Sequence, residues 1–256
     1  MKNKILYVTT FNEKLYELSG RYLIDTFKKH NVEGQLLVCT EGMEASQIRN
    51  KGGVAFYDAT HDEFRQKILQ ENKDIVDVQY GGQVRSWPKG RDGDFNRHWP
   101  RFFWKVVALS YALRGYGDSH DVIVQLDCDI KFSSCLSEKN LEKLFGDAGV
   151  FYCLGPQRRR IQTGIEAGVV GFRREVSGYE FLKTYINVFD SGKFRAYYRK
   201  DDGLVLKIVV ESNPQFKTRD LVGSHPLKAR APVIPYSPLA AYLEHDKGLH
   251  KHYLEK

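Results

Sequence analysis

The sequence predicts an α/β protein in which a mostly parallel sheet is flanked by helices. Short apolar runs rich in β-branched residues alternate along the chain with segments whose apolar residues recur at helical spacing. Strands that alternate with helices imply a sheet covered on both faces. The chain has 256 residues, of which 42% are hydrophobic and 28% charged, so it is long enough to bury a sizeable core.

The elements follow in a regular order. The run 4–10 predicts a buried strand, and Asn12 is placed to cap a helix whose apolar residues lie at positions 15, 18, 22, 23 and 27. Further strands are expected at 35–39, 54–57, 121–126, 149–154 and 167–172. Further helices are expected at 62–70, 101–114 and 136–145, after 172 to about 189, and at 201–210. The segment 81–100, rich in Gly, Arg, Trp and Pro, predicts a long loop, and the tail from Pro232 has few periodic signals.

The net charge and the composition limit which classes of function the protein can have. Lysine and arginine number 39 against 32 acidic residues, which gives a formal net charge of +7. This excess suits an anionic ligand, such as nucleic acid, a membrane surface or a phosphorylated small molecule, or it serves solubility alone. No apolar run approaches the length of a membrane-spanning helix, and the run 5–8 is too short for a signal peptide. The four cysteines lack zinc-site spacing. We therefore expect a cytoplasmic protein.

The strand expected at 121–126 is followed by two carboxylates, Asp127 and Asp129. In an extended chain they point to the same side, and Cys128 points to the other. Paired carboxylates suit a hard divalent cation such as Mg²⁺ or Mn²⁺, which can bridge a diphosphate and neutralise a leaving group. The alternative is that both acids cap a turn. A second pair, Asp92 and Asp94, follows no apolar strand and is interpreted as solvated loop surface.

Several common nucleotide-binding motifs are absent. No GxGxxG follows the first strand, and GxxxxGK[ST] occurs nowhere in the chain. These absences argue against a Rossmann dehydrogenase and a P-loop NTPase.

The order of motifs resembles GT-A-fold glycosyltransferases, the nucleotide-sugar-dependent class with a DxD motif, over most of the chain. This resemblance implies a GT-A-type, Rossmann-like mixed or mostly parallel sheet in one domain over 1–256. The donor half would reach to about 130, and the acceptor half and a closing segment would occupy about 131–256. It implies transfer of a hexose or pentose from a nucleoside-diphosphate sugar, with UDP favoured, to a hydroxyl of a glycan or glycoconjugate. The cofactor would be Mn²⁺ or Mg²⁺.

The resemblance also assigns residues to the donor site. The end of the first strand resembles a nucleotide-binding strand, and the helix before the DxD strand resembles one whose basic residues approach the donor phosphates. Two of those basic residues, Arg101 and Lys105, lie four positions apart and share a helix face. The donor-binding candidates are Thr9, Thr10, Phe11, Asn12, Arg101, Lys105 and Asp127.

The resemblance offers three catalytic carboxylates. Glu166 precedes a glycine-containing strand that resembles the segment lining the sugar and acceptor site. Asp201 and Asp202 open a helix, where an acid is also a good cap. One of the three would deprotonate the acceptor hydroxyl in an inverting enzyme, or stabilise an oxocarbenium-like sugar in a retaining one. The sequence leaves this choice open.

A late histidine completes the metal site in several members of the class. His245 is the best match here, so the implied metal ligands are Asp127, Asp129 and His245, with Lys247 as a phosphate contact. The segment departs from the clean HxxGxxKPW pattern, which puts the third ligand in doubt.

Two other functions stay open beside the enzyme. One is a non-catalytic module that binds a nucleotide sugar or a glycan. The other is a nucleic-acid-binding protein, suggested by the arginine run 158–160 and the basic aromatic segment 85–101. Acids interleave the basic clusters, so no nucleic acid is expected. If the segment 85–101 does not bind nucleic acid, we expect it to contact a membrane surface, to cover the donor site or to line the acceptor groove.

Overall fold

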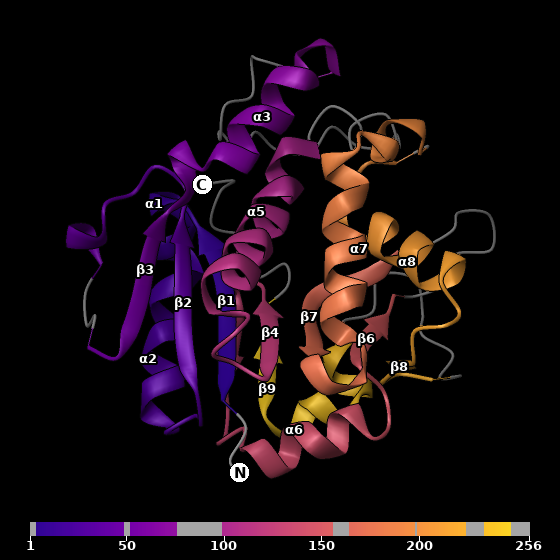
Figure 1. Cartoon of the computed structure of the whole chain (residues 1–256). Helices are drawn as coiled ribbons and strands as arrows, with labels where there is room; N and C mark the ends of the chain where they lie inside the picture. The colour runs from indigo at the N-terminus through magenta and orange to yellow at the C-terminus, as the bar shows by residue number, and fades with distance from the viewer. Residues whose placement is uncertain are drawn as a thin grey trace.

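The computed structural model describes residues 4–48, 52–75, 99–155, 164–197, 199–223 and 233–246. Among these residues, seven strands form one sheet in the order β3-β2-β1-β4-β7-β6-β8 (Figure 1). β1 is parallel to β2 and β4, β2 is parallel to β3, and β6 is parallel to β8, whereas β7 runs antiparallel to both of its neighbours. The strands are β1 (Ile5–Phe11), β2 (Gln35–Thr40), β3 (Val54–Asp58), β4 (Val122–Leu126), β6 (Val150–Leu154), β7 (Ile165–Arg173) and β8 (Thr218–Asp220). The predicted α/β class and mostly parallel sheet are confirmed.

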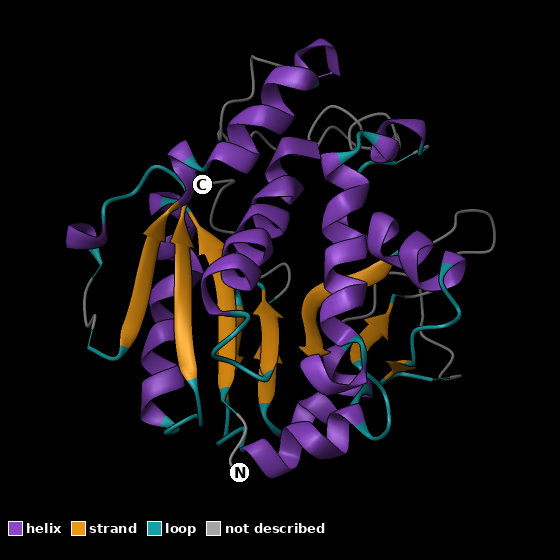
Figure 2. Cartoon of the chain, viewed as in Figure 1, coloured by secondary structure: helices purple, strands orange, loops and turns teal. Residues whose placement is uncertain are grey.

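Helices cover both faces of the sheet (Figures 1 and 2). Alternate β1 residues face opposite ways: Tyr7 packs with α2 (Arg21–Lys29) and α6 (Glu138–Phe145), whereas Leu6 and Val8 pack with the helices of the other face. The helices of that second face are α3 (Glu63–Glu71), α5 (Trp99–Tyr116), α7 (Gly178–Asp190) and α8 (Asp202–Ser212). This alternation is the two-residue period of a strand, and it divides the core into two clusters.

The helix predicted after Asn12 forms in three parts. Asn12 caps α1 (Glu13–Leu15) as predicted, and a π-helical segment, η1 (Tyr16–Gly20), joins α1 to α2. Gly20 lies against the ring of Phe11, and a Cβ at this position would lie 2.8 Å from a ring carbon. The chain therefore approaches β1 closely at the point where its helical geometry is irregular.

The structure contains short elements that the sequence did not predict. Two three-residue strands, β5 (Ile130–Phe132) and β9 (Leu243–His245), form a separate antiparallel sheet, and β8 extends the edge of the main sheet. The segment after Val233 forms two 3₁₀ turns, η8 (Ile234–Tyr236) and η9 (Pro238–Ala241). The other 3₁₀ turns are η2 (Ala45–Gln47), η3 (Ala59–His61), η4 (Lys73–Ile75), η6 (Arg174–Val176) and η7 (Lys193–Ala196).

The loop predicted at 81–100 ends earlier than expected, because Trp99 and Pro100 already belong to α5. Proline is well tolerated in the first turn of a helix, where its missing N–H has no partner to lose. Residues 81–98 lie outside the described residues.

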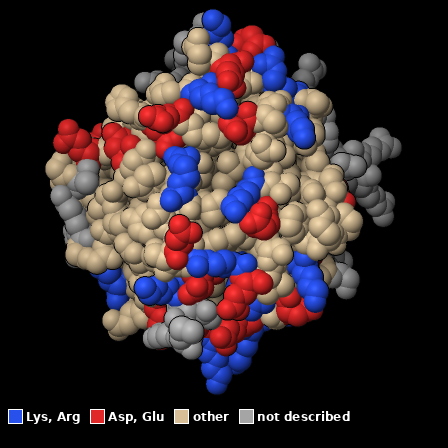
Figure 3. Space-filling model, in the orientation of Figure 1, with Lys and Arg blue, Asp and Glu red and all other residues tan. Residues whose placement is uncertain are grey.

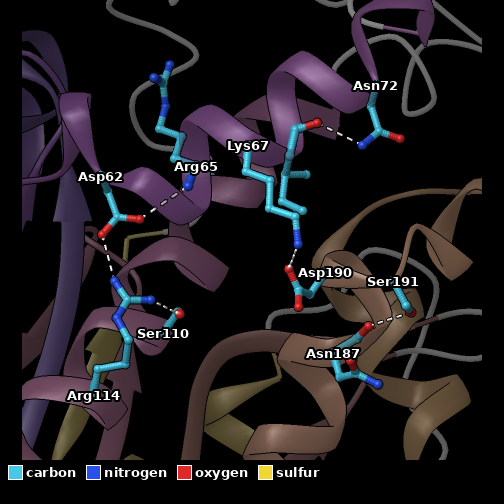
Figure 4. A network of polar contacts seen from close by, with 10 residues as sticks. Asp62, Arg65, Lys67, Asn72, Ser110, Arg114, Asn187, Asp190 and Ser191 are labelled. Atoms are coloured by element: carbon cyan, nitrogen blue, oxygen red, sulfur yellow. Dashed lines mark hydrogen bonds and ion pairs between the residues drawn. The ribbon is translucent and has the colours of Figure 1, made fainter.

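A buried carboxylate ties α3 to its surroundings (Figure 4). Asp62 caps α3 by accepting a hydrogen bond from the backbone N–H of Arg65 at 3.2 Å, and it accepts others from Arg114 Nη2 at 2.8 Å and Tyr57 Oη at 2.9 Å. An exposed ion pair between Lys67 and Asp190, at 2.8 Å, joins α3 to α7. These contacts fix the layer of helices on the second face.

Charges are mixed on the surface seen in Figure 3, where blue and red side chains alternate over the described residues. The net positive charge therefore forms no continuous basic band on this face. Within the described ranges, no helix combines the length and apolar character needed to cross a bilayer.

Candidate functional site

Polar residues from β1, β4 and β7 meet at one edge of the sheet. β1 and β4 are parallel, so their carboxyl ends lie together, and Val8 pairs with Gln125 in register. β7 runs the other way and therefore begins at this same edge, where Asp127 donates its backbone N–H to the carbonyl of Gly168 at 2.8 Å. Reversal of β7 thus places Glu166 and Gly168 beside the end of β4.

Three predicted ligands come together at this edge. Asp127, Asp129 and His245 each offer one ligand atom, and these atoms lie within 4.8 Å of one another. His245 reaches the site because β9 pairs with β5, directly after the two aspartates, with Ile130 opposite His245. Its Nε2 lies 3.1 Å from Asp129 Oδ1.

The residue types of the cluster suit a divalent cation. Two carboxylates and an imidazole suit Mn²⁺ or Mg²⁺. The His245 side chain is 2% exposed, and its Nδ1 has no hydrogen-bond partner among the described residues. Gly168 leaves the floor of the cluster open, since a Cβ there would lie 3.3 Å from both Asp127 Oδ2 and His245 Cε1. The residues present therefore fit such an ion.

Asp129 and His245 each favour the charged form of the other. Burial raises the pKa of Asp129, but the hydrogen bond and charge of His245 outweigh it and hold this pKa below its ordinary value. Burial lowers the pKa of His245, but the hydrogen bond and charge of Asp129, with smaller effects from Asp127 and Glu166, raise it overall. Asp129 therefore stays ionised and ready to bind a cation.

Lys105, from α5, lies between two carboxylates. Its Nζ is 2.5 Å from Asp127 Oδ1 and 2.9 Å from Asp202 Oδ2. Burial would lower the pKa of Lys105, but the charges of these two acids outweigh it and hold its pKa well above the ordinary value. Burial raises the pKa of Asp202 to about 6 against the opposing charge of Lys105. Of the residues predicted from sequence, Asp127, Lys105 and Asp202 thus form one ion-pair group.

The other two catalytic candidates lie in different surroundings. Asp201 pairs with Arg199 Nε at 2.8 Å and caps α8 by accepting from the backbone N–H of Leu204 at 3.1 Å. Glu166 lies next to the metal ligands, because its Oε1 would be 3.6 Å from a Cβ on Gly168. The structure thus brings Glu166 to the cluster, whereas the Asp201 carboxylate is engaged by Arg199 and the start of α8.

The four residues at the end of β1 divide by role. The Phe11 side chain is fully buried in the core, and the Asn12 side chain accepts from the backbone N–H of Leu15 at 2.9 Å. Thr9 is buried, and its hydroxyl has no hydrogen-bond partner among the described residues. Thr10 donates to Glu41 Oε1 at 2.9 Å. The side chains of Phe11 and Asn12 therefore take part in the fold, and a role of these residues in binding the donor nucleotide stays a prediction.

Glu41 was missed by the sequence reasoning. It follows β2 directly, at the carboxyl edge of the sheet, and this position was the available signal. Burial raises the pKa of Glu41 to about 7, although the hydrogen bond from Thr10 and the charges of Arg101, Arg65 and Lys105 act in the opposite direction. Arg101, exposed in the first turns of α5, therefore lies within electrostatic reach of this edge. Lys247 and the run 158–160 lie outside the described residues.

No protein-family description matches the chain, and no curated protein sequence matches it. Among solved structures, the apo form of mouse xyloside xylosyltransferase 1 is similar, with 14% sequence identity and a TM-score of 0.47. The match covers 86% of this chain and 85% of that one.

Proposed function

We propose that this chain is a metal-dependent glycosyltransferase. It would transfer a hexosyl or pentosyl group from a nucleoside-diphosphate sugar, with UDP favoured, to a hydroxyl of a glycan or glycoconjugate. The observation that carries this proposal is the convergence of Asp127, Asp129 and His245 at the carboxyl edge of the sheet, with the Lys105 ammonium beside them. Ligands of open α/β sheets bind at this edge.

The donor diphosphate needs positive charge around it. Asp127, Asp129 and His245 would hold a Mn²⁺ or Mg²⁺ ion, which would supply positive charge next to the diphosphate. Lys105 adds a fixed cation next to that site, and Arg101 lies four residues earlier on the same helix. Lys247, two residues after His245 in sequence, is the third basic candidate. Such preorganised charge is often the largest contribution to catalysis.

We assign the catalytic carboxylate to Glu166. It lies at the start of β7 beside the proposed metal ligands, since its Oε1 and Asp127 Oδ2 both lie within 4 Å of a Cβ placed on Gly168. In an inverting reaction the acceptor oxygen bonds to the anomeric carbon, the bond from that carbon to the diphosphate oxygen breaks, and Glu166 takes the hydroxyl proton. In a retaining reaction the same carboxylate stabilises the positively charged sugar.

The test is thermal unfolding with UDP, GDP, CDP and dTDP, each with and without Mn²⁺. A ligand that binds only the folded state adds about 2.7 kcal/mol of stability at a hundredfold excess over its Kd. We expect one nucleotide to raise the Tm of the wild type only when Mn²⁺ is present, and to have no effect on Asp129→Asn. Asp118→Asn, which changes an exposed aspartate on another loop, is the matched control and should respond as the wild type does.

Turnover then separates the enzyme from a binding module. We expect the responding nucleotide, as its sugar conjugate, to be hydrolysed or transferred by the wild type and not by Glu166→Gln. Binding without turnover would favour the non-catalytic module. Absence of any nucleotide response, together with salt-sensitive oligonucleotide binding, would contradict the proposal and favour a nucleic-acid-binding protein.

A further inference from the structure

We propose that Asp202 is a positioning residue that holds the Lys105 ammonium aside when a divalent cation takes up Asp127. In this arrangement Lys105 pairs with Asp127 in the absence of a metal ion, and Asp202 is the carboxylate that would still pair with Lys105 when an ion binds Asp127. The inference rests on the proposed metal site. It gives Asp202 a role distinct from that of the base.

The geometry places one ammonium between two carboxylates from distant parts of the chain. Asp127 follows β4, Lys105 lies within α5, and Asp202 is the first residue of α8. Lys105 Nζ approaches Asp127 Oδ1 at 2.5 Å and Asp202 Oδ2 at 2.9 Å. The three side chains are 20%, 21% and 7% exposed for Lys105, Asp127 and Asp202, so the contact is largely shielded from solvent.

The two cations compete for Asp127. A divalent ion bound to Asp127, Asp129 and His245 would lie close to an ammonium 2.5 Å from the same carboxylate, and like charges at that range repel. Lys105 must therefore loosen its contact with Asp127 when the ion binds. A largely buried ammonium without a carboxylate partner is strongly unfavourable, so the cost of metal binding depends on what else holds Lys105.

Asp202 meets that need. Its Oδ2 is buried and lies 2.9 Å from Lys105 Nζ. It lies in the first turn of α8, where the helix dipole favours a negative charge. A carboxylate committed in this way keeps the ammonium beside the site in both states. Lys105 thus remains available to the diphosphate without opposing the metal.

A double-mutant cycle measures this coupling. Mn²⁺ affinity is determined by titration calorimetry and by electron paramagnetic resonance of free Mn²⁺, with no nucleotide or sugar present. The variants are Lys105→Gln, Asp202→Asn and the double variant. Lys139→Gln, which removes an exposed cation on α6, is the control. Circular dichroism and thermal unfolding verify that each variant is folded.

We expect Lys105→Gln to tighten Mn²⁺ binding about fivefold or more, because it removes the competing cation, and Asp202→Asn to weaken it by a similar factor. In the Lys105→Gln background, Asp202→Asn should have almost no effect, since there is no ammonium left to hold. Lys139→Gln should leave Mn²⁺ affinity within about twofold of the wild type. If Lys105→Gln does not fold, Lys105→Met replaces it in the cycle, and an unchanged affinity in Asp202→Asn overturns the inference in either case.

The outcomes separate this inference from the proposed function. If the wild type binds no Mn²⁺, the proposed metal site is wrong, and the inference about Asp202 is wrong with it. A wild type that binds Mn²⁺, with Asp202→Asn weakening it equally in both backgrounds, overturns the inference alone, because Asp202 would then act only through its own charge. An unchanged affinity in Lys105→Gln overturns it as well.

Discussion

His245 Nε2 lies 3.1 Å from Asp129 Oδ1, although nearly half of the chain separates these residues in sequence. The contact depends on the small β5–β9 sheet, in which Ile130 pairs with His245. A three-residue strand that follows the DxD motif therefore determines which late residue reaches the two aspartates. The candidate metal site and this small sheet are one structural unit.

Replacing His245 by alanine should weaken Mn²⁺ binding at least about tenfold, because it removes one of three ligands. The measurement is a Mn²⁺ titration followed by electron paramagnetic resonance. His61→Ala is the control, since His61 is exposed on η3. Equal affinities in the two variants would show that His245 does not bind the ion.

Replacing Gly168 by alanine should weaken Mn²⁺ binding several-fold with little loss of stability. The added Cβ would lie 3.3 Å from Asp127 Oδ2 and from His245 Cε1, so both side chains would have to move. Gly115→Ala is the matched control, because nothing lies within 4 Å of its added Cβ. Gly115 lies in the last turn of α5, and this change should leave Mn²⁺ affinity unchanged.

Glu41 should make stability depend on pH. Its pKa is about 7 in the folded protein against an ordinary value of 4.5, mainly through burial. Between these values the unfolded state releases a proton that the folded state retains, so stability falls as the pH rises, and the whole penalty remains above pH 7. Glu41→Gln should therefore be more stable than the wild type at pH 8, by up to about 3 kcal/mol, and equally stable at pH 4.

Urea unfolding at the two pH values measures this difference. Glu44→Gln, an exposed glutamate three residues later, is the control and should show no pH-dependent gain. If Glu41→Gln gained nothing at pH 8, Glu41 would be ionised without cost in the folded protein.

Asp62→Ala should lower the free energy of unfolding by about 2–4 kcal/mol. The change removes the cap of α3 and leaves the Tyr57 hydroxyl and Arg114 without this shared acceptor. Asp190→Ala breaks the exposed ion pair between Lys67 of α3 and Asp190 of α7 and should cost less than about 1 kcal/mol. Similar losses in the two variants, measured by urea unfolding, would contradict the role assigned to Asp62.

The sequence predicted the main sheet well because its strands are long enough to show a pattern. β1, β2 and β4 are apolar runs of five to seven residues, and the paired aspartates stand directly after one of them. β5 and β9 have three residues each, which is too short for periodicity, and their pairing is between distant segments. Local patterns cannot predict such a pairing.

Some residues of the candidate site could likewise be predicted from local sequence patterns, and others could not. Asp127 and Asp129 were recognisable from their position after a strand, and His245 only from the resemblance. Glu41 is a single acid after β2, and no second residue near it in sequence marks it as unusual. Asp201 and Asp202 are neighbours in sequence, yet one pairs with Arg199 and the other with Lys105. Their side chains point in different directions from the start of α8, and the sequence does not show these directions.

The β5–β9 pairing also has a consequence for synthesis on the ribosome. Asp127 and Asp129 leave the exit tunnel more than a hundred residues before His245, so a nascent chain holds the two carboxylates without the imidazole. Throughout that interval Lys105 can neutralise Asp127 once α5 has docked, because both residues precede β5 in the chain. If the proposed site binds a metal ion, full coordination would therefore wait for the synthesis of β9.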